Sequence, residues 1–281
     1  MNLVALLSMT LISHQASAPP AFYYDKTFDT PRLCQTDPDG NYANGGKNYC
    51  APTAAANAIV FLARHGYPSL LSGDTMEDAY ALVRQLASSD FIGTEGRDGT
   101  NDTAMILGIS KYLQTCGVEI KRFEYEGYRP LFGRLGGTDH ATTVNLNWVK
   151  EKTAQPNTVV WLHLGYYSYV SPGTYKRYNG HYINVVGSGW DGAVTDPNLL
   201  IIRNPLAKKL SRPVDPKMMM PMDEVILKPT KDVTLIGDYK GLPRRANDLY
   251  TISGIAVSKL KGDQLTLVDG ALALELIPPQ D

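Results

Sequence analysis

The sequence predicts an α+β fold in which N-terminal helices pack on a C-terminal antiparallel sheet. Helical patterns with caps and glycine stops lie mainly before residue 117, whereas runs rich in valine, isoleucine and tyrosine follow it. Helices and strands segregated along a chain in this way are typical of α+β domains with antiparallel sheets. The 25 glycines and 18 prolines fit a loop-rich protein of this class.

The first helix is expected to run from Cys50 to near Gly66, after a polar, turn-rich segment over residues 21–48. Pro52 suits its first turn, where a missing N–H costs no intrahelical bond. Behind it, Ala56 and Ile59 belong to an apolar stripe that would bury one face of the helix.

Two more helices are expected, over residues 75–87 and from about residue 102 to Cys116, where Gly117 would stop the helix. Both are preceded by side chains that cap helix N-termini. The candidate caps are Asp74 or Thr75 for the earlier helix and Asn101 or Asp102 for the later one.

The segments expected to form strands come later in the chain, and all are rich in β-branched or aromatic residues. The expected strands are residues 118–125, 158–167, 182–186 and 199–203, with a tyrosine-rich hairpin or loop over 165–179 and a short helix over 147–151.

The N-terminus has the pattern of a secretory signal peptide over residues 1–18. An apolar run from Leu3 to Ile12 is followed by polar residues and then by Ala16-Ser17-Ala18. A buried N-terminal helix is the alternative. Because no other segment approaches transmembrane length, we expect a secreted or periplasmic protein with no stable insertion in a membrane.

Charge and cysteine content narrow the function classes. The 27 basic and 28 acidic residues nearly cancel, so nothing indicates a nucleic acid partner. The three cysteines leave one thiol unpaired in an oxidising compartment. If Cys34 pairs with Cys116, the remaining thiol is Cys50.

Cys50 is the candidate nucleophile. A thiol attacks as thiolate, and the dipole and free N–H groups of a helix N-terminus favour that anion. The alternative is a small buried cysteine at a helix start.

A nucleophilic cysteine needs a base, and His181 is the expected one. It begins a buried strand behind Gly180, which allows close approach. His65 would lie roughly 22 Å from Cys50 along the helix, which is too far for it to be the base. The remaining histidines are assigned other places: His14 in the signal peptide, His140 in a polar loop and His163 in the core of a strand.

Asn204 is the expected partner of the base. If strands 182–186 and 199–203 form a hairpin, Asn204 returns to the level of His181. Asp191 and Asp196, in the connection between these strands, remain alternatives.

An oxyanion donor is expected beside the Cys50 backbone N–H. Gln35 is the upstream glutamine that suits this role, and Asn44 and Asn48 compete with it.

These residues together resemble the papain-like cysteine peptidases, above all the bacteriocin-processing type and its secreted bacterial relatives. The resemblance rests on an upstream Gln, Tyr-Cys-Ala-Pro-Thr-Ala opening a helix, Gly-His-Tyr on a strand and Arg-Asn-Pro after the next strand, and it covers about residues 33–206. Ala51 replaces the usual glycine, and the interval from Gln35 to Cys50 is longer than is typical.

The resemblance implies a papain-like catalytic domain over residues 19–210 that needs no cofactor or metal. Cys50 would be its nucleophile, His181 its base, Asn204 the residue that orients the base and Gln35 the oxyanion donor. Residues 211–281 would be a C-terminal extension packed on the same domain, either completing the sheet or forming a lid.

The predicted function is therefore a secreted cysteine peptidase that hydrolyses peptide or protein substrates through an acyl-enzyme. One alternative is a transglutaminase-like acyltransferase with the same triad. Another is a non-catalytic binding protein on a papain-like scaffold, with the tyrosine-rich residues 166–178 as its contact surface.

Overall fold

A computed structural model describes the chain from residue 24 onward, with gaps. The described residues are 24–95, 99–127, 129, 131, 140–141, 143–188, 198–206, 223–230, 233–236, 244–246, 249–253 and 264–279. The expected signal peptide, residues 1–18, lies outside them, as do the alternative triad members Asp191 and Asp196. No helix within the described ranges has the length and apolar character needed to cross a membrane.

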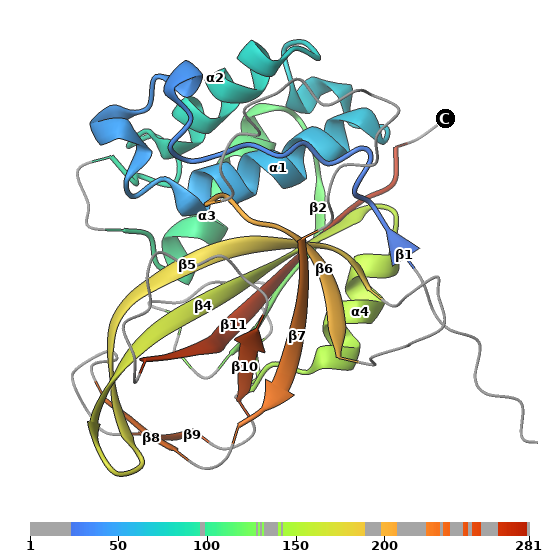
Figure 1. Ribbon diagram of the computed structural model, residues 1–281. Coiled ribbons are helices and arrows are strands. Elements are labelled where there is room, and N and C mark those ends of the chain that lie inside the picture. Colours follow the sequence, from blue (N-terminus) through green and yellow to red (C-terminus); the bar gives the residue numbers. More distant parts are fainter. Residues whose placement is uncertain are drawn as a thin grey trace, which may run out of the picture.

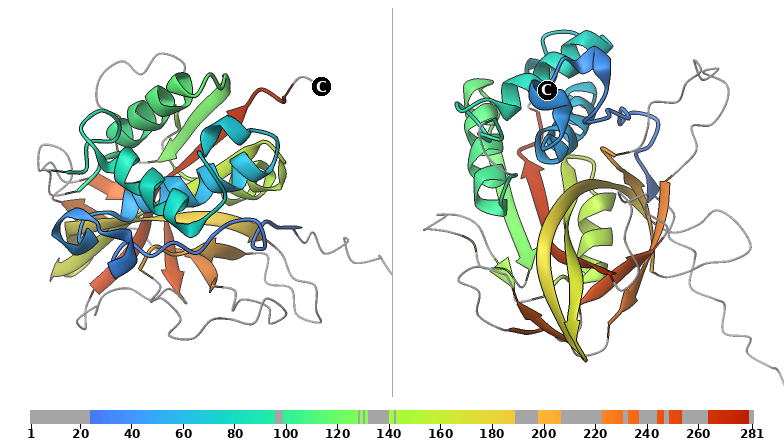
Figure 2. Two further views of the ribbon diagram at one scale, coloured as in Figure 1. Left: turned by 90° about the horizontal axis from the view of Figure 1, so that it is seen from above. Right: turned by 60° about the vertical axis from the view of Figure 1, so that its left-hand side comes forward.

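The protein has the expected α+β class, with helices packed against a largely antiparallel sheet. Three helices lie together on one side of the sheet (Figures 1 and 2), and a fourth lies between β3 and β4 in the chain. The helices are α1 (Cys50–Arg64), α2 (Met76–Ala87), α3 (Asp102–Thr115) and α4 (Leu146–Ala154).

The described residues supply eleven strands to a single sheet. Most pairs are antiparallel, and β2 with β3 and β5 with β8 are parallel. The longer strands are β2 (Ile120–Gly127), β4 (Thr158–Ser171), β5 (Thr174–Ser188), β6 (Leu199–Arg203), β7 (Asp223–Pro229) and β11 (Gln264–Leu276). The shorter ones are β1 (Tyr24–Asp25), β3 (His140–Ala141), β8 (Val233–Ile236), β9 (Arg244–Ala246) and β10 (Tyr250–Ser253).

Alternation along β4 divides the core between the two faces of the sheet, because successive side chains of a strand point to opposite faces. Trp161 belongs to the cluster that contains α1, α2 and α3. Its neighbours Val160 and Leu162 belong to the cluster that contains α4.

The C-terminal strand β11 is an internal strand of the sheet. It lies between β2 and β4 and pairs with both in antiparallel register, from Gln264 with Ser168 at one end to Leu276 with Ile120 at the other. Residues far apart in the sequence therefore meet in the middle of the sheet.

α1 is held against the sheet by its small side chains and by one shared carbonyl. Ala51 and Ala54 are fully buried, which lets the helix approach the strands closely. The carbonyl of Ala54 accepts a bond from Trp161 Nε1 at 3.0 Å and another from Asn184 Nδ2 at 2.7 Å. These bonds fix the helix, and Cys50 at its first residue, over β4 and β5.

The predicted caps of α2 and α3 are confirmed within the stated alternatives. Thr75 caps α2 in a capping box with Asp78. Asn101 caps α3, where its Oδ1 accepts from the N–H of Ala104 at 2.8 Å. Asp102 is therefore not the cap, and its carboxylate is available for other contacts.

The cysteine pairing considered from the odd count is not formed. Cys34, Cys50 and Cys116 are all free thiols. Cys34 lies buried beside Thr36, with 3.4 Å between Sγ and Oγ1. Cys116 ends α3 as its C-cap residue.

Candidate active site

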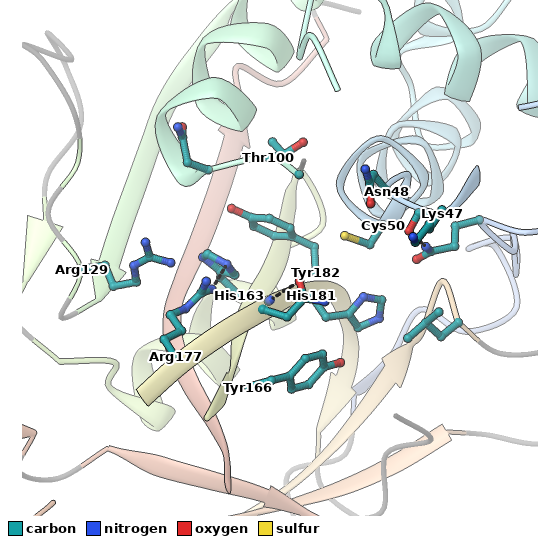
Figure 3. A pocket seen from close by; sticks show the side chains of 16 residues that line it. Lys47, Asn48, Cys50, Thr100, Arg129, His163, Tyr166, Arg177, His181 and Tyr182 are labelled. Atoms are coloured by element: carbon teal, nitrogen blue, oxygen red, sulfur yellow. Dashed lines mark hydrogen bonds between the residues drawn. The ribbon is translucent and has the colours of Figure 1, made fainter. Parts of the chain in front are cut away.

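A cavity of about 320 Å³ opens where the start of α1 faces β4 and β5 (Figure 3). Five segments remote in the sequence form its wall: the loop before α1 with Cys50, the loop before α3, the residues after β2, the β4–β5 hairpin and the residues after β6. The lining residues are Gln35, Lys47, Asn48, Cys50, Gly99, Thr100, Asn101, Arg129, His163, Tyr166, Arg177, Asn179, Gly180, His181, Tyr182 and Leu206.

His181 and Asn204 are in direct contact, as the hairpin argument predicted. β5 and β6 pair antiparallel, which brings the end of β6 back toward the start of the buried half of β5. His181 Nε2 lies 2.8 Å from Asn204 Oδ1, and both residues are buried. The Asp191 and Asp196 alternatives fall outside the described residues.

The hydrogen bonds around Asn204 also settle which nitrogen of His181 carries the proton. Asn204 Oδ1 accepts a second bond, from the backbone N–H of Leu206 at 3.0 Å, which fixes the orientation of the amide. An amide oxygen only accepts, so His181 Nε2–H must donate to it. Nδ1 is left as the basic nitrogen of the ring.

Cys50 lies at the first residue of α1, half-buried in the wall of the cavity (Figure 3). Its thiol accepts a bond from the backbone N–H of Tyr182, the residue directly after His181. This contact joins the start of α1 to β5 at the position of the candidate base. Burial raises the pKa of the Cys50 thiol, although this bond and the N–H groups of Ala51 and Cys50 favour the thiolate.

The pKa of His181 changes in the opposite direction to that of the Cys50 thiol. Burial lowers the pKa of His181 to about 4, and the bond to Asn204 only partly opposes that change. A raised thiol pKa and a lowered imidazole pKa both favour a neutral thiol beside a neutral imidazole. Removing the thiol proton at the moment of attack would therefore be the task of Nδ1.

Gln35 lines the cavity, but its amide group faces the loop before Cys50. Nε2 donates to the carbonyls of Gly46 at 3.1 Å and Lys47 at 3.2 Å. Of the competing amides, Asn48 also lines the cavity. Asn44 instead adopts a left-handed turn conformation, with φ of 52°.

The other histidines are accounted for separately. His65 is far along α1, where Nε2 lies 3.1 Å from Asp29 at the surface. His140 begins β3, and His14 lies outside the described residues. His163 is buried, as expected for a strand position, but it also lines the cavity.

His163 belongs to a buried polar network that the sequence reasoning did not predict. Its ring stacks on Tyr182 with 4.3 Å between centroids, and both residues bind the carboxylate of Asp102. His163 Nδ1 is 3.0 Å from Asp102 Oδ2, and the Tyr182 hydroxyl donates to Oδ1 at 2.7 Å. Burial opposes ionisation of Asp102, but His163 and these bonds outweigh it and hold its pKa below the usual range.

The network continues to a second buried carboxylate, Asp269 on β11. Arg177 approaches His163 Nε2 through Nη2 at 3.1 Å and donates through Nε to Asp269 at 2.8 Å. The Tyr167 hydroxyl donates to the same carboxylate at 2.7 Å, and the Arg129 guanidinium lies 3.9 Å from it.

One tyrosine of the predicted tyrosine-rich segment takes part in the cavity. Tyr166 is 5% exposed and lines it, and its hydroxyl has no hydrogen-bond partner among the described residues. Tyr167 is fully buried, whereas Tyr169 and Tyr178 are exposed. Tyr166 thus places a free donor in the wall of the site.

Some signals of the network were present in the sequence. Asp269 interrupts an apolar run, and such a carboxylate needs a partner. Gly165 and Gly180 pair directly across β4 and β5. A Cβ at Gly165 would lie 2.3 Å from Asp269, and one at Gly180 would lie 2.3 Å from Arg177. Which side chains would fill these spaces depends on the sheet order, which sequence patterns alone do not specify.

The described residues contain no group of three or more His, Cys, Asp or Glu side chains arranged to hold a metal ion. A comparison with models of known protein families gives no match for this sequence, and a comparison with curated proteins gives no significant match.

Proposed function

We propose that this protein is a secreted or periplasmic cysteine peptidase with a papain-like arrangement of catalytic residues. Cys50 is the nucleophile, His181 the general base and Asn204 the residue that orients the base. The hydrogen bond between His181 Nε2 and Asn204 Oδ1 carries this proposal, since it leaves Nδ1 as a base on the strand that contacts the Cys50 thiol.

The proposed reaction begins when Cys50 Sγ attacks the carbonyl carbon of a peptide bond. The thiol proton passes to His181 Nδ1, and the carbonyl oxygen becomes an oxyanion. The backbone N–H of Cys50 and the Gln35 amide are its proposed donors. For Gln35 this requires one amide hydrogen to turn from a loop carbonyl to the substrate.

Collapse of this intermediate breaks the C–N bond, and His181 returns its proton to the leaving amine. The product that stays behind is a thioester on Cys50. Water then attacks the thioester with His181 again as base, which releases the carboxylic acid and restores the thiol. Asn204 keeps the imidazole in the tautomer that both half-reactions need.

The direct test is hydrolysis of fluorescently labelled casein by the full chain. We expect release of labelled peptides, loss of this activity in Cys50→Ala, and activity close to wild type in the matched variants Cys34→Ala and Cys116→Ala. Activity in Cys50→Ala equal to that of wild type would overturn the proposal.

The same experiment separates hydrolysis from acyl transfer. Adding a primary amine together with a glutamine-containing peptide gives a cross-linked product if the acyl group passes to the amine. We expect the free carboxylic acid to remain the main product, which mass spectrometry distinguishes from the amide.

A further inference from the structure

Three basic side chains line the cavity that contains Cys50, and two of them, both arginines, lie away from the thiol (Figure 3). Lys47, Arg129 and Arg177 line it, and none of the described lining residues is a carboxylate. In the view of Figure 3, the two arginines lie to one side of His163 and Cys50 lies to the other. A substrate that fills the cavity would thus meet the thiol and the arginines with different parts.

Arg177 is held in place by two hydrogen bonds. Nε donates to Asp269 at 2.8 Å, and Nη2 donates to His163 Nε2 at 3.1 Å. Since arginine nitrogens only donate, His163 Nε2 accepts this bond and Nδ1–H donates to Asp102. The histidine thus links Arg177 to a second anchored carboxylate, and the direction of the guanidinium is fixed before any ligand binds.

One fully buried carboxylate serves both arginines. Asp269 has no exposed surface and lies 2.8 Å from Arg177 and 3.9 Å from Arg129, whose side chains are 14% and 16% exposed. Burying a carboxylate is costly unless it is paired, so Asp269 requires this cationic surrounding. Asp102, the second buried carboxylate, also interacts with Arg129, so the two acidic and two basic groups balance in charge. Both arginines line the cavity and neither carboxylate does, so the cavity wall presents guanidinium N–H donors.

From this arrangement we propose that the arginine side of the cavity binds a carboxylate of the peptide substrate. The inference rests on the proposed function, which makes the ligand a peptide. Guanidinium groups match carboxylates in planar geometry, and a partly desolvated arginine gives such a contact strength and direction. The carboxylate belongs either to an Asp or Glu side chain or to the C-terminus of the peptide.

Two pairs of epoxysuccinyl peptides test this proposal, because all four alkylate an active-site thiol. One pair differs only by Glu or Gln in the peptide, with the C-terminus amidated. The other lacks acidic side chains and differs by a free or an amidated C-terminus. We expect the carboxylate member of one pair to modify Cys50 at least about tenfold faster, the factor that a bond to a charged group supplies. The pair that shows the difference identifies the source of the carboxylate.

Arginine variants connect this preference to the proposed residues. Arg177→Gln should bring the two rates of the selective pair to within about threefold. Because that change leaves Asp269 without its 2.8 Å partner, Arg129→Gln provides a second variant with a weaker structural role. Arg64→Gln, at the surface end of α1 beside Asp74, is the matched control and should keep the wild-type preference.

The outcomes separate the two proposals. If the reagents modify Cys50 but neither pair differs, the carboxylate site is wrong and the proposed function stands. A preference that survives in both Arg129→Gln and Arg177→Gln also overturns it. If none of the four reagents modifies Cys50 in the folded protein, the proposed function itself fails.

Discussion

Burial changes the pKa values of Cys50 and His181 in opposite directions, and both changes favour the neutral form of the side chain. The pKa of the thiol is raised and that of the imidazole is lowered to about 4. A resting thiolate–imidazolium pair is therefore disfavoured, and in the proposed reaction His181 would take the proton during the attack. The cost of burying the imidazole can be measured separately from any activity.

The first prediction concerns the pH dependence of stability. Folded His181 has a pKa near 4, against 6.5 for an ordinary histidine, so the unfolded chain binds more protons between these values. The contribution of neutral His181 is complete above pH 6.5 and is lost as the pH falls toward 4. The loss in unfolding free energy should be about 3 kcal/mol over this window.

Urea unfolding at neutral pH and at about pH 4.5 checks this linkage. His181→Gln should remove most of the drop in unfolding free energy, whereas His65→Gln, at the surface beside Asp29, should retain it. An equal drop in wild type and His181→Gln would show that His181 is not buried in its neutral form.

The second prediction separates the two roles open to Gln35. An oxyanion donor acts on hydrolysis, whereas alkylation of a thiol by iodoacetamide forms no oxyanion. Gln35→Ala should lower kcat about 100-fold to 1,000-fold while the rate of Cys50 alkylation changes little. Asn48→Ala, at the competing amide that also lines the cavity, is the comparison and should lower kcat much less.

If Gln35→Ala lowers the rates of hydrolysis and of Cys50 alkylation equally, Gln35 only holds the loop before α1 in place and is not an oxyanion donor. A larger loss of kcat in Asn48→Ala would transfer the oxyanion role to Asn48.

At the scale of elements, the turn before α1 sets the distance between Gln35 and Cys50. Gly45 and Gly46 both have positive φ, at 61° and 72°. A Cβ at Gly46 would lie 1.5 Å from the carbonyl oxygen of Gln35, whereas one at Gly45 meets nothing within 4 Å. Only the second glycine is therefore needed for close packing.

This contrast gives the third prediction. Gly45→Ala should cost about 1 kcal/mol, from the left-handed conformation alone. Gly46→Ala should cost roughly 3 kcal/mol or more, because backbone must move as well. Denaturant unfolding of both variants measures the difference. Similar losses in unfolding free energy would mean that Gly46 does not pack closely against the Gln35 carbonyl.

Local patterns were sufficient for the four helices, for β2, β4, β5 and β6, and for the His181–Asn204 contact. The caps Thr75 and Asn101 and the run that forms β6 are read from neighbouring residues, and a hairpin needs only adjacent strands. The Asp102–His163 pair and the role of Asp269 could not be predicted in this way, because they join α3, β4 and β11 across the sheet. Strand order is set by long-range packing and not by periodicity.

In the whole molecule, the C-terminal strand β11 lies between β2 and β4, which come much earlier in the chain. β11 pairs along its length with β4 and β2 and carries Asp269, which holds Arg177 in the cavity wall. The two ends of the described chain thus share one sheet, and the candidate site depends on residues after 263 that do not line it.

The fourth prediction follows from this position. A chain shortened to residues 1–263 should lose its cooperative thermal unfolding transition, because β2 and β4 would lose their common partner. A chain ending at Pro279, which keeps β11, should unfold like the full protein. Calorimetry distinguishes the two, and a cooperative transition in the shorter chain would mean that β11 is only an accessory strand.

In the proposed reaction His181 activates the Cys50 thiol, and the rate of Cys50 alkylation by iodoacetamide measures this activation. Mass mapping at neutral pH should show Cys50 modified faster than Cys34 or Cys116 in the folded protein. His181→Ala should slow its modification by about 100-fold, the scale of general-base assistance, while His65→Ala should leave it unchanged. An unmodified Cys50, or equal rates in wild type and His181→Ala, would contradict the account.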